Sequence, residues 1–293
     1  MLRRAHWAIA VISLLGFCVA TRAQESYYGN YVIHLKPGKG AAFEALVKKM
    51  VAANRDYQGD NWVVIQTAFG ESGTISSVAL RQSYGEFQKA SDAFDKAVEK
   101  AMGHPGTEQF FEELDNCIAA YHPLLLRRRP DLSSNFPSDR ATEAKIVGNT
   151  RWIRTIRITV RVGQYQRFEE LAKHVKAAQE KADPNLYSWV SESVAGESEG
   201  VYYVSQLRSS LAGFDGETPL PQIMGNDAWQ SLLKTASEVI QSEDVTLSQI
   251  RGDLSNPPDD IASVAPSFWR PKPAAAAATP GAGAAKAKVP PKK

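Results

Sequence analysis

Alternation between apolar and polar residues predicts the first strand of the chain, near residues 30–35. Its two faces differ, with Tyr31, Ile33 and Leu35 on one and Asn30, Val32 and His34 on the other. A helical stripe over 43–54 follows, and then two β-rich runs at 62–69 and 74–82 flank a Gly-Glu-Ser-Gly turn. A helix over 85–102, a shorter helical piece at 110–114 and a strand over 118–128 complete a β-α-β-β-α-β order.

The second half of the chain predicts the same order of elements. Its first strand, 151–162, sets Ile156, Ile158 and Val160 against Thr155, Arg157 and Thr159. A helix at 168–175, strands at 186–194 and 201–207, a helix over 229–240 and a strand over 245–251 follow. Residues 210–226 are rich in Gly and Pro and predict a loop, where the first half predicts a regular helix.

Short sequence blocks recur in one order, 122 to 127 residues apart. They are Phe43-Glu44-x-Leu46 with Phe168-Glu169-x-Leu171, Gly70-Glu71-Ser72 with Gly196-Glu197-Ser198, Leu80-Arg81 with Leu207-Arg208, and Arg129-x-Asp131-Leu132-Ser133 with Arg251-x-Asp253-Leu254-Ser255. Units of this length are far longer than solenoid repeats. We therefore expect two α+β repeats, at 27–133 and 150–255, joined by a polar linker at 134–149.

The β-α-β-β-α-β order is that of the ferredoxin-like plait. A tandem pair resembles the dimeric α+β barrel superfamily, which includes antibiotic-biosynthesis monooxygenase-type and NIPSNAP-type domains. The resemblance covers residues 27–255, rests on pattern alone and carries over no catalytic residue. It implies that two plaits pack sheet against sheet as an internal pseudo-dimer around a small pocket, and it allows heme as a cofactor.

Five residues on the strands are candidates for ligand binding. They are His34, Arg157, Trp189, Glu192 and Tyr202. His34 is either a ligand-binding or catalytic group or a hydrogen-bonded sheet histidine, and Arg157 either binds an anion or is paired within the protein. Trp189, Tyr202 and the adjacent Tyr203 either stack on a planar ligand or pack in the sheet. Glu192 is a candidate base only if it is buried.

Familiar catalytic motifs are missing from the sequence. It holds no P-loop, dinucleotide-binding glycine fingerprint, His-Glu-x-x-His, Gly-x-Ser-x-Gly or Cys-x-x-Cys, so we assign no catalytic residue and predict no metal site. Arg81 and Arg208 recur just after the third strand of each half, which predicts a charge pair at the strand end in both copies.

The N-terminus has the pattern of a signal peptide. Arg3 and Arg4 precede a 14-residue apolar run, Trp7–Ala20, and a small-x-small site that ends at Ala23. The run is short of the roughly 20 residues of a spanning helix, and no other run of that length follows. We expect cleavage near Ala23, a periplasmic or secreted protein without a transmembrane segment, and Cys117 as its only cysteine.

Charge is unevenly distributed along the chain. Without the three basic residues of the signal and the six from Arg270 onward, 25 basic residues face 32 acidic ones. An acidic body argues against a nucleic-acid partner. The Pro-, Ala- and Lys-rich tail, 256–293, predicts disorder, and either contacts the cell envelope or only aids solubility.

These observations favour an exported protein that binds a small ligand between two sheets. One alternative is an oxygenase, either cofactor-independent or heme-dependent, as the resemblance implies. The other is a structural or interaction protein without a ligand. A cavity lined by His34 and Arg157 would favour the ligand-binding functions, whereas a solidly packed interior would leave the structural role.

Overall fold

A computed structural model of the chain describes residues 25–271. The expected signal peptide, 1–23, and the tail beyond residue 271 lie outside the described residues, so their predictions are not tested. In the described part of the chain, no helix combines the length and the apolar character that crossing a membrane requires.

The described residues form strands and helices in nearly the predicted order. The strands are β1 (Tyr27–Leu35), β2 (Val63–Phe69), β3 (Thr74–Arg81), β4 (Ile118–Arg128), β5 (Trp152–Val160), β6 (Ser188–Ala195), β7 (Val201–Arg208) and β8 (Ile240–Ile250). The helices are α1 (Gly40–Asp56), α2 (Tyr84–Asp115), α3 (Arg140–Asn149), α4 (Tyr165–Ala182), α5 (Leu220–Met224), α6 (Asn226–Val239), α7 (Asp259–Ala262) and α8 (Pro266–Trp269), with 3₁₀ turns η1 (Leu211–Phe214) and η2 (Gly252–Leu254).

All eight strands close into one antiparallel barrel in the order β1-β3-β2-β8-β5-β7-β6-β4. Antiparallel pairs β2–β8 and β4–β6 join the strands of the two sequence halves. Because neighbours alternate in direction, β1, β2, β5 and β6 run one way and the other four run back. The β2–β3 and β6–β7 hairpins therefore lie at the same end of the barrel, which we call the hairpin mouth. The opposite end is the linker end.

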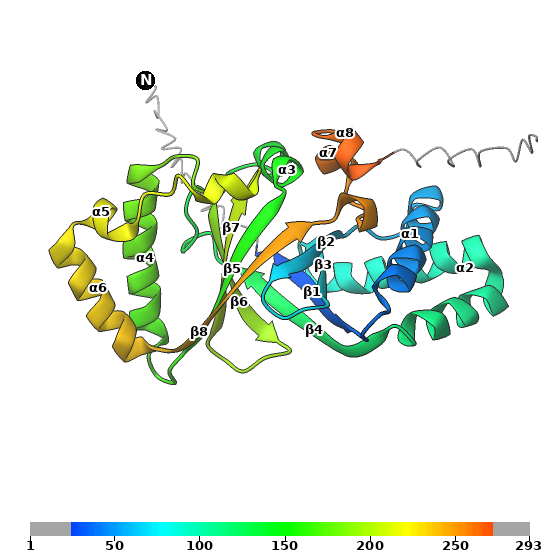
Figure 1. Cartoon of the computed structure of the whole chain (residues 1–293), viewed down its shortest axis with the longest axis horizontal. Helices are drawn as coiled ribbons and strands as arrows, with labels where there is room; N and C mark the ends of the chain where they lie inside the picture. The colour runs from blue at the N-terminus through cyan, green and yellow to red at the C-terminus, as the bar shows by residue number, and fades with distance from the viewer. Residues whose placement is uncertain (1–24, 272–293) are drawn as a thin grey trace, which may run out of the picture.

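Helices cover the outside of the barrel in two groups. Figure 1 shows α1 and α2 on one side and α4, α5 and α6 on the other, with the strands between them. The outward strand faces pack on these helices because period-two alternation gives each strand one apolar side. One core forms around Phe43 and Val98 and the other around Phe168 and Val239, all of which are buried.

Two segments differ from the sequence prediction. The linker contains a helix, α3, and residues 256–270 are not an unstructured tail but include α7 and α8. Ile261 and Trp269 pack with Ile153 and Ile250 in a third core, so tertiary packing stabilises helices too short to stand alone. The two helical pieces expected at 85–102 and 110–114 are confirmed as the two parts of α2, which meet at a kink where Gly103 adopts a positive φ of 69°.

The recurring arginines pair with carboxylates, as predicted. Arg81 bonds to Asp60, and Arg208 bonds to Glu217, which lies in the segment where the two halves differ most. That segment, 210–226, holds the short helices η1 and α5 in place of a long regular helix. The shared charge pair therefore anchors different chain segments at equivalent strand ends.

Candidate functional site

A cavity of about 700 Å³ occupies the interior of the barrel. Its wall is built by alternate residues of every strand, because successive side chains of a strand point to opposite faces of the sheet. The inward residues include Tyr28, Asn30, Val32 and His34 of β1, Thr74, Ser76, Val78 and Leu80 of β3, Ile153, Thr155 and Arg157 of β5, and Tyr203, Ser205 and Leu207 of β7. The predicted inner face of β1 is thus confirmed.

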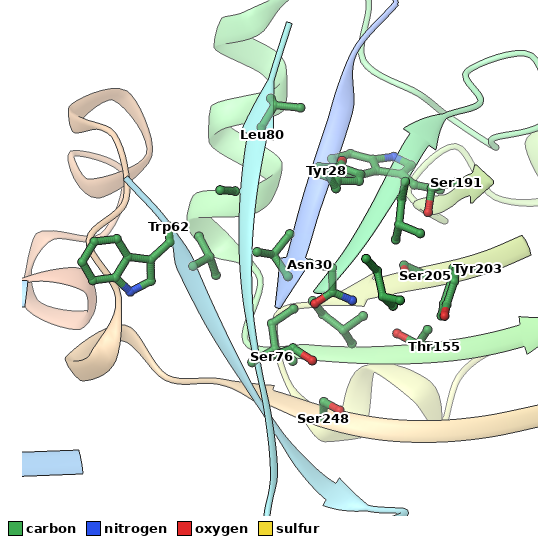
Figure 2. Close-up of a pocket in the computed structure, with 18 of the residues that line it drawn as sticks. Tyr28, Asn30, Trp62, Ser76, Leu80, Thr155, Ser191, Tyr203, Ser205 and Ser248 are labelled. Carbon is green, nitrogen blue, oxygen red and sulfur yellow. The ribbon is translucent and has the colours of Figure 1, made fainter. Parts of the chain in front are cut away.

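Small hydroxyl side chains form a polar belt around the middle of the cavity. Figure 2 shows them converging with Asn30 on one space. The belt consists of Ser76, Thr155, Ser191, Ser205 and Ser248. Hydroxyl groups both donate and accept hydrogen bonds, so the belt can orient a polar group of a ligand without imposing a net charge.

At the linker end, α3 and α7 contribute side chains to the cavity lining, and both helices lie above the strands in Figure 1. Arg128 lies there, buried, between the rings of Tyr28 and Phe136, whose centroids are 5.3 and 4.6 Å from its guanidinium carbon. Its Nη2 donates to Glu143 Oε1 of α3 at 2.9 Å. The ion pair and the rings together make this end aromatic and close to neutral.

The hairpin mouth carries two histidines. His34 Nδ1 lies 3.2 Å from Thr74 Oγ1 and 3.3 Å from Glu71 Oε1 of the β2–β3 hairpin. The His122 ring meets the His34 ring edge-on, with centroids 5.6 Å apart. Within residues 25–271, no group of three or more His, Cys, Asp or Glu side chains is arranged to hold a metal ion.

The other side of the mouth is formed by the second half. Arg157 donates from Nε and Nη2 to the Glu197 carboxylate at 3.1 and 3.0 Å, and Tyr203 donates its hydroxyl to the same carboxylate at 2.7 Å. The bond to Glu197 raises the pKa of the Arg157 guanidinium. Burial, followed by the bond to Glu197, raises the pKa of Tyr203, which keeps this hydroxyl protonated at neutral pH.

Charges that line the cavity are compensated within the protein. The four lining arginines and their carboxylate partners are Arg81 with Asp60, Arg128 with Glu143, Arg140 with Asp260, and Arg157 with Glu197. An anionic ligand would have to displace one of these carboxylates. The arrangement therefore favours an uncharged ligand.

Four buried polar atoms of lining residues lack a partner among the described residues. Two are the Nε atoms of Arg81 and Arg128, and the other two are Asn30 Oδ1 and Trp189 Nε1. An unsatisfied buried donor or acceptor costs about 1–3 kcal/mol. Asn30 lies at the polar belt and Trp189, 7% exposed, packs on the Phe136 ring at a centroid distance of 5.6 Å. A ligand or water that bonded to Asn30 Oδ1 or Trp189 Nε1 would remove this cost for that atom.

Three of the five predicted site residues line the cavity, and two do not. His34, Arg157 and Trp189 line it, as the alternation predicts. Tyr202 instead faces outward, where its ring packs on Phe168 at 4.6 Å, and Glu192 bonds to arginines outside the cavity. Both are one residue out of phase with the inner face.

Of the neighbouring tyrosines Tyr202 and Tyr203 of β7, the one that lines the cavity is Tyr203. It is paired across the sheet with Arg157. The strand register, had it been known, would have assigned Tyr203 to the cavity, because paired residues of neighbouring strands point to the same face.

No family model matches the sequence, and none of the curated proteins matches it. Some solved structures can be aligned with most of the chain, at low TM-scores. An anthrone oxidase-like protein is 12% identical, with 78% of this chain and 92% of that chain covered and a TM-score of 0.46. A heme-binding protein from Thermus thermophilus (9% identical, 81% and 94% covered) and a variant chlorite dismutase from Candidatus Nitrospira defluvii (9%, 81% and 94%) each have a TM-score of 0.44.

Identities and scores this low carry no argument about this chain, so its function has to follow from its own residues. The closed barrel of eight antiparallel strands, with its outer helices, agrees by itself with the dimeric α+β barrel resemblance that the repeat suggested.

Proposed function

We propose that the protein binds one small, uncharged, partly aromatic molecule inside the barrel. The observation that carries this proposal is the cavity of about 700 Å³, within the 300–1,000 Å³ typical of ligand pockets. Aromatic side chains at the linker end supply a surface for a planar ring, and the hydroxyl belt supplies hydrogen bonds at its middle. Compensation of every lining arginine favours a neutral ligand over the anionic one that Arg157 suggested.

Ligand binding can be tested with matched pairs of small molecules. Neutral hydroxylated or carbonyl-bearing polycyclic aromatics are expected to raise the melting temperature and quench tryptophan fluorescence, and their carboxylated analogues are not. Ser205→Leu, which fills the belt, should abolish the effect, whereas Ser242→Leu on the exposed part of β8 should not. If neutral and carboxylated compounds act alike, or if Ser205→Leu leaves binding intact, the proposal is wrong.

The second candidate is an oxygenase that needs no cofactor. The specific observation is the convergence of His34, Glu71 and Thr74 at the open mouth of the cavity. A carboxylate next to an imidazole orients it as a base, and such a base could remove the proton from a phenolic or enolic hydroxyl. The resulting electron-rich anion reacts with molecular oxygen.

Oxygen uptake tests this candidate directly. An oxygen electrode should record consumption with an electron-rich phenol or enol, and His34→Gln should reduce it at least tenfold, with no change in neutral ligand binding. Glu71→Gln should produce a smaller loss because it only orients the imidazole. Uptake that is equal in His34→Gln and the unmodified protein would leave ligand binding as the function.

Heme does not fit the described lining as well. His34 and His122 offer nitrogen atoms for iron, but the propionates would need free cations, and the lining arginines are bound to carboxylates. We therefore expect no shifted Soret band when hemin is titrated into the protein. A Soret shift that disappears in His34→Ala would overturn this expectation.

The duplicated architecture and the location are part of the proposal. The strand order within each half, β4-β1-β3-β2 and β8-β5-β7-β6, supports two tandem ferredoxin-like plaits that pair as an internal dimer. Export to the periplasm or the medium is supported by the sequence of residues 1–23, and a signal-peptide cleavage assay by N-terminal sequencing tests it. Binding of the basic tail to the envelope is tested by fractionating cells that express a chain without residues 271–293.

A further inference from the structure

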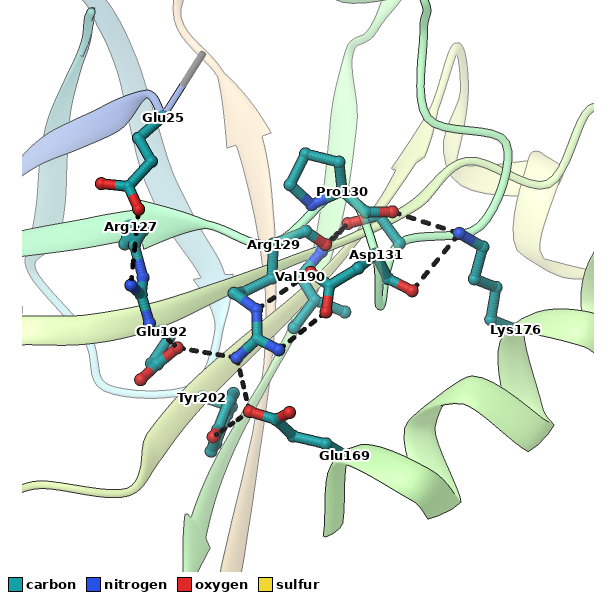
Figure 3. Close-up of polar contacts among 11 residues, drawn as sticks. Glu25, Arg127, Arg129, Pro130, Asp131, Glu169, Lys176, Val190, Glu192 and Tyr202 are labelled. Carbon is teal, nitrogen blue, oxygen red and sulfur yellow. Dashed lines mark hydrogen bonds and ion pairs between the residues drawn. The ribbon is translucent and has the colours of Figure 1, made fainter. Parts of the chain in front are cut away.

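The duplicated Arg-x-Asp-Leu-Ser segment of the first half docks on the second half. Arg129 directly follows β4, and its backbone N–H donates to Val190 O at 2.8 Å, while Val190 N–H donates to Ser133 Oγ at 2.8 Å. The guanidinium Nη1 donates to Glu169 Oε1 of α4 at 2.6 Å and to Glu192 Oε2 of β6 at 2.8 Å. Figure 3 shows Arg129 between these carboxylates.

The copy in the second half makes the same bonds to the first half. Arg251 N–H donates to Val64 O at 2.9 Å, and Val64 N–H donates to Ser255 Oγ at 2.8 Å. The guanidinium donates to both Glu44 oxygens at 2.9 Å and to Gln66 Oε1. Every group of the first arrangement thus has a counterpart in the second, with Gln66 in place of Glu192.

The leucines of the two segments lie in the core of the opposite half. Leu132 is 2% exposed and belongs to the cluster around Phe168 of α4. Leu254 is fully buried in the cluster around Phe43 of α1. Each core is therefore completed by a side chain that the other half supplies.

We propose that each half carries a binding site for an Arg-x-Asp-Leu-Ser peptide, and that the two halves recognise one another by exchanging these peptides. We call residues 129–133 and 251–255 the clasps. The clasp sites are formed by α4 with β6 and by α1 with β2. The proposal concerns the outer surface and is independent of the ligand proposed for the barrel interior.

The chemistry explains why four positions of the clasp recur. Asp131 accepts from Arg129 Nε and Nη2 at 2.9 and 2.7 Å, which fixes the guanidinium so that Nη1 reaches the site's carboxylates. Bidentate pairing of this kind gives directional recognition. The serine hydroxyl replaces a strand neighbour by bonding to the valine N–H, and it donates to the carbonyl of its own arginine.

The second position is the one that differs between the two clasps, and the reason is steric. It is Pro130 in one clasp and Gly252 in the other. A Cβ atom on Gly252 would lie 2.4 Å from the Phe268 carbonyl oxygen, so the second clasp excludes a side chain there. Pro130→Gly is expected to be tolerated, whereas Gly252→Pro should weaken the second clasp.

A cut in the linker makes the recognition measurable in the whole protein. A protease site inserted between Pro137 and Ser138, in the exposed stretch before α3, separates the halves without removing residues. The cut protein should elute as one complex. Leu254→Ala should raise the dissociation constant of the two pieces roughly 30-fold or more, and Leu233→Ala, at a leucine 42% exposed, should leave it unchanged.

A second variant covers the case in which Leu254→Ala does not fold. Arg251→Lys keeps the positive charge but loses the planar guanidinium that bonds to two acceptors at once. It should weaken association of the two pieces at least tenfold, while the circular dichroism of the uncut chain stays the same. In a double-mutant cycle, Arg251→Ala and Glu44→Ala should be strongly non-additive. If Arg251→Lys pieces stay as tightly bound as the unmodified pieces, or if the cycle is additive, strand pairing alone joins the halves and the proposal is overturned.

Discussion

Removing one partner of the Arg128–Glu143 pair should strongly destabilise the protein. The Arg128 side chain is 5% exposed and the Glu143 side chain 11%, with 2.9 Å between Nη2 and Oε1. Glu143→Ala leaves a guanidinium buried between two aromatic rings without a counter-ion. Breaking a buried pair in this way costs about 3–5 kcal/mol. At about 2–4 °C per kcal/mol for a domain of this size, the melting temperature should fall by about 6–20 °C.

A surface pair in the same molecule provides the matched control. Arg167 Nη2 and Glu238 Oε2 are 2.6 Å apart, but their side chains are 48% and 44% exposed. Glu238→Ala should therefore cost far less stability than Glu143→Ala. Urea unfolding followed by circular dichroism, with calorimetry as a second probe, measures both free energies of unfolding.

A third variant separates desolvation from packing. Replacing both partners with apolar residues, Arg128→Met with Glu143→Leu, should recover most of the lost stability because no charge is left unpaired. The reasoning is refuted if Glu143→Ala costs no more than Glu238→Ala, or if the apolar double variant is less stable than Glu143→Ala. Either result would mean that water reaches the linker end of the cavity.

Further predictions concern the clasp, a hairpin and acid. Leu254→Ala should lower the free energy of unfolding by about 2–5 kcal/mol. Hydrogen exchange should show that the amides of α1, which lies in the opposite half, lose protection before those of α4. Gly196→Ala should cost more than 1 kcal/mol in urea unfolding, because φ is +94° and a Cβ would meet a carbonyl oxygen at 2.4 Å; Gly163→Ala, at a similar φ in open space, should cost less. Bonds from Arg251 lower the pKa of Glu44 and Asp253 in the folded protein. The stabilisation from these carboxylates is complete above their pKa values in the unfolded chain, about 4, and is lost as the pH falls through their lower folded pKa values. Arg251→Ala should therefore weaken the dependence of the free energy of unfolding on pH in that acid range.

Period-two alternation was enough to predict which face of β1 and β5 lines the cavity. It placed His34 and Arg157 there because each strand contrasts a clear apolar face with a mixed one. It failed for Tyr202 and Glu192, whose strands carry large or polar residues at neighbouring positions. Only the pairing register, which depends on partner strands far away in sequence, shows that Tyr203 faces inward.

Other features depended on tertiary contacts that a single sequence does not display. The helices α7 and α8 are four residues each, and their stability comes from Trp269, which packs against strands of both halves. The repeat of Arg129 and Arg251 was visible in the sequence, but repetition does not indicate whether a segment binds its own half or the other. The exchange of clasps therefore became apparent only in the folded chain.

The two walls of the cavity occupy equivalent places in the barrel but carry different side chains. Arg157 and its neighbour Tyr203 stand where the first half has Val32 and Ser76. In a barrel assembled from two identical chains, any mutation on one wall would appear on the other as well. In this single chain the two walls are encoded separately, so a substitution on one wall leaves the other unchanged. A cavity with unlike walls can hold an unsymmetrical molecule in one orientation, whereas a cavity with two identical walls would bind it in two.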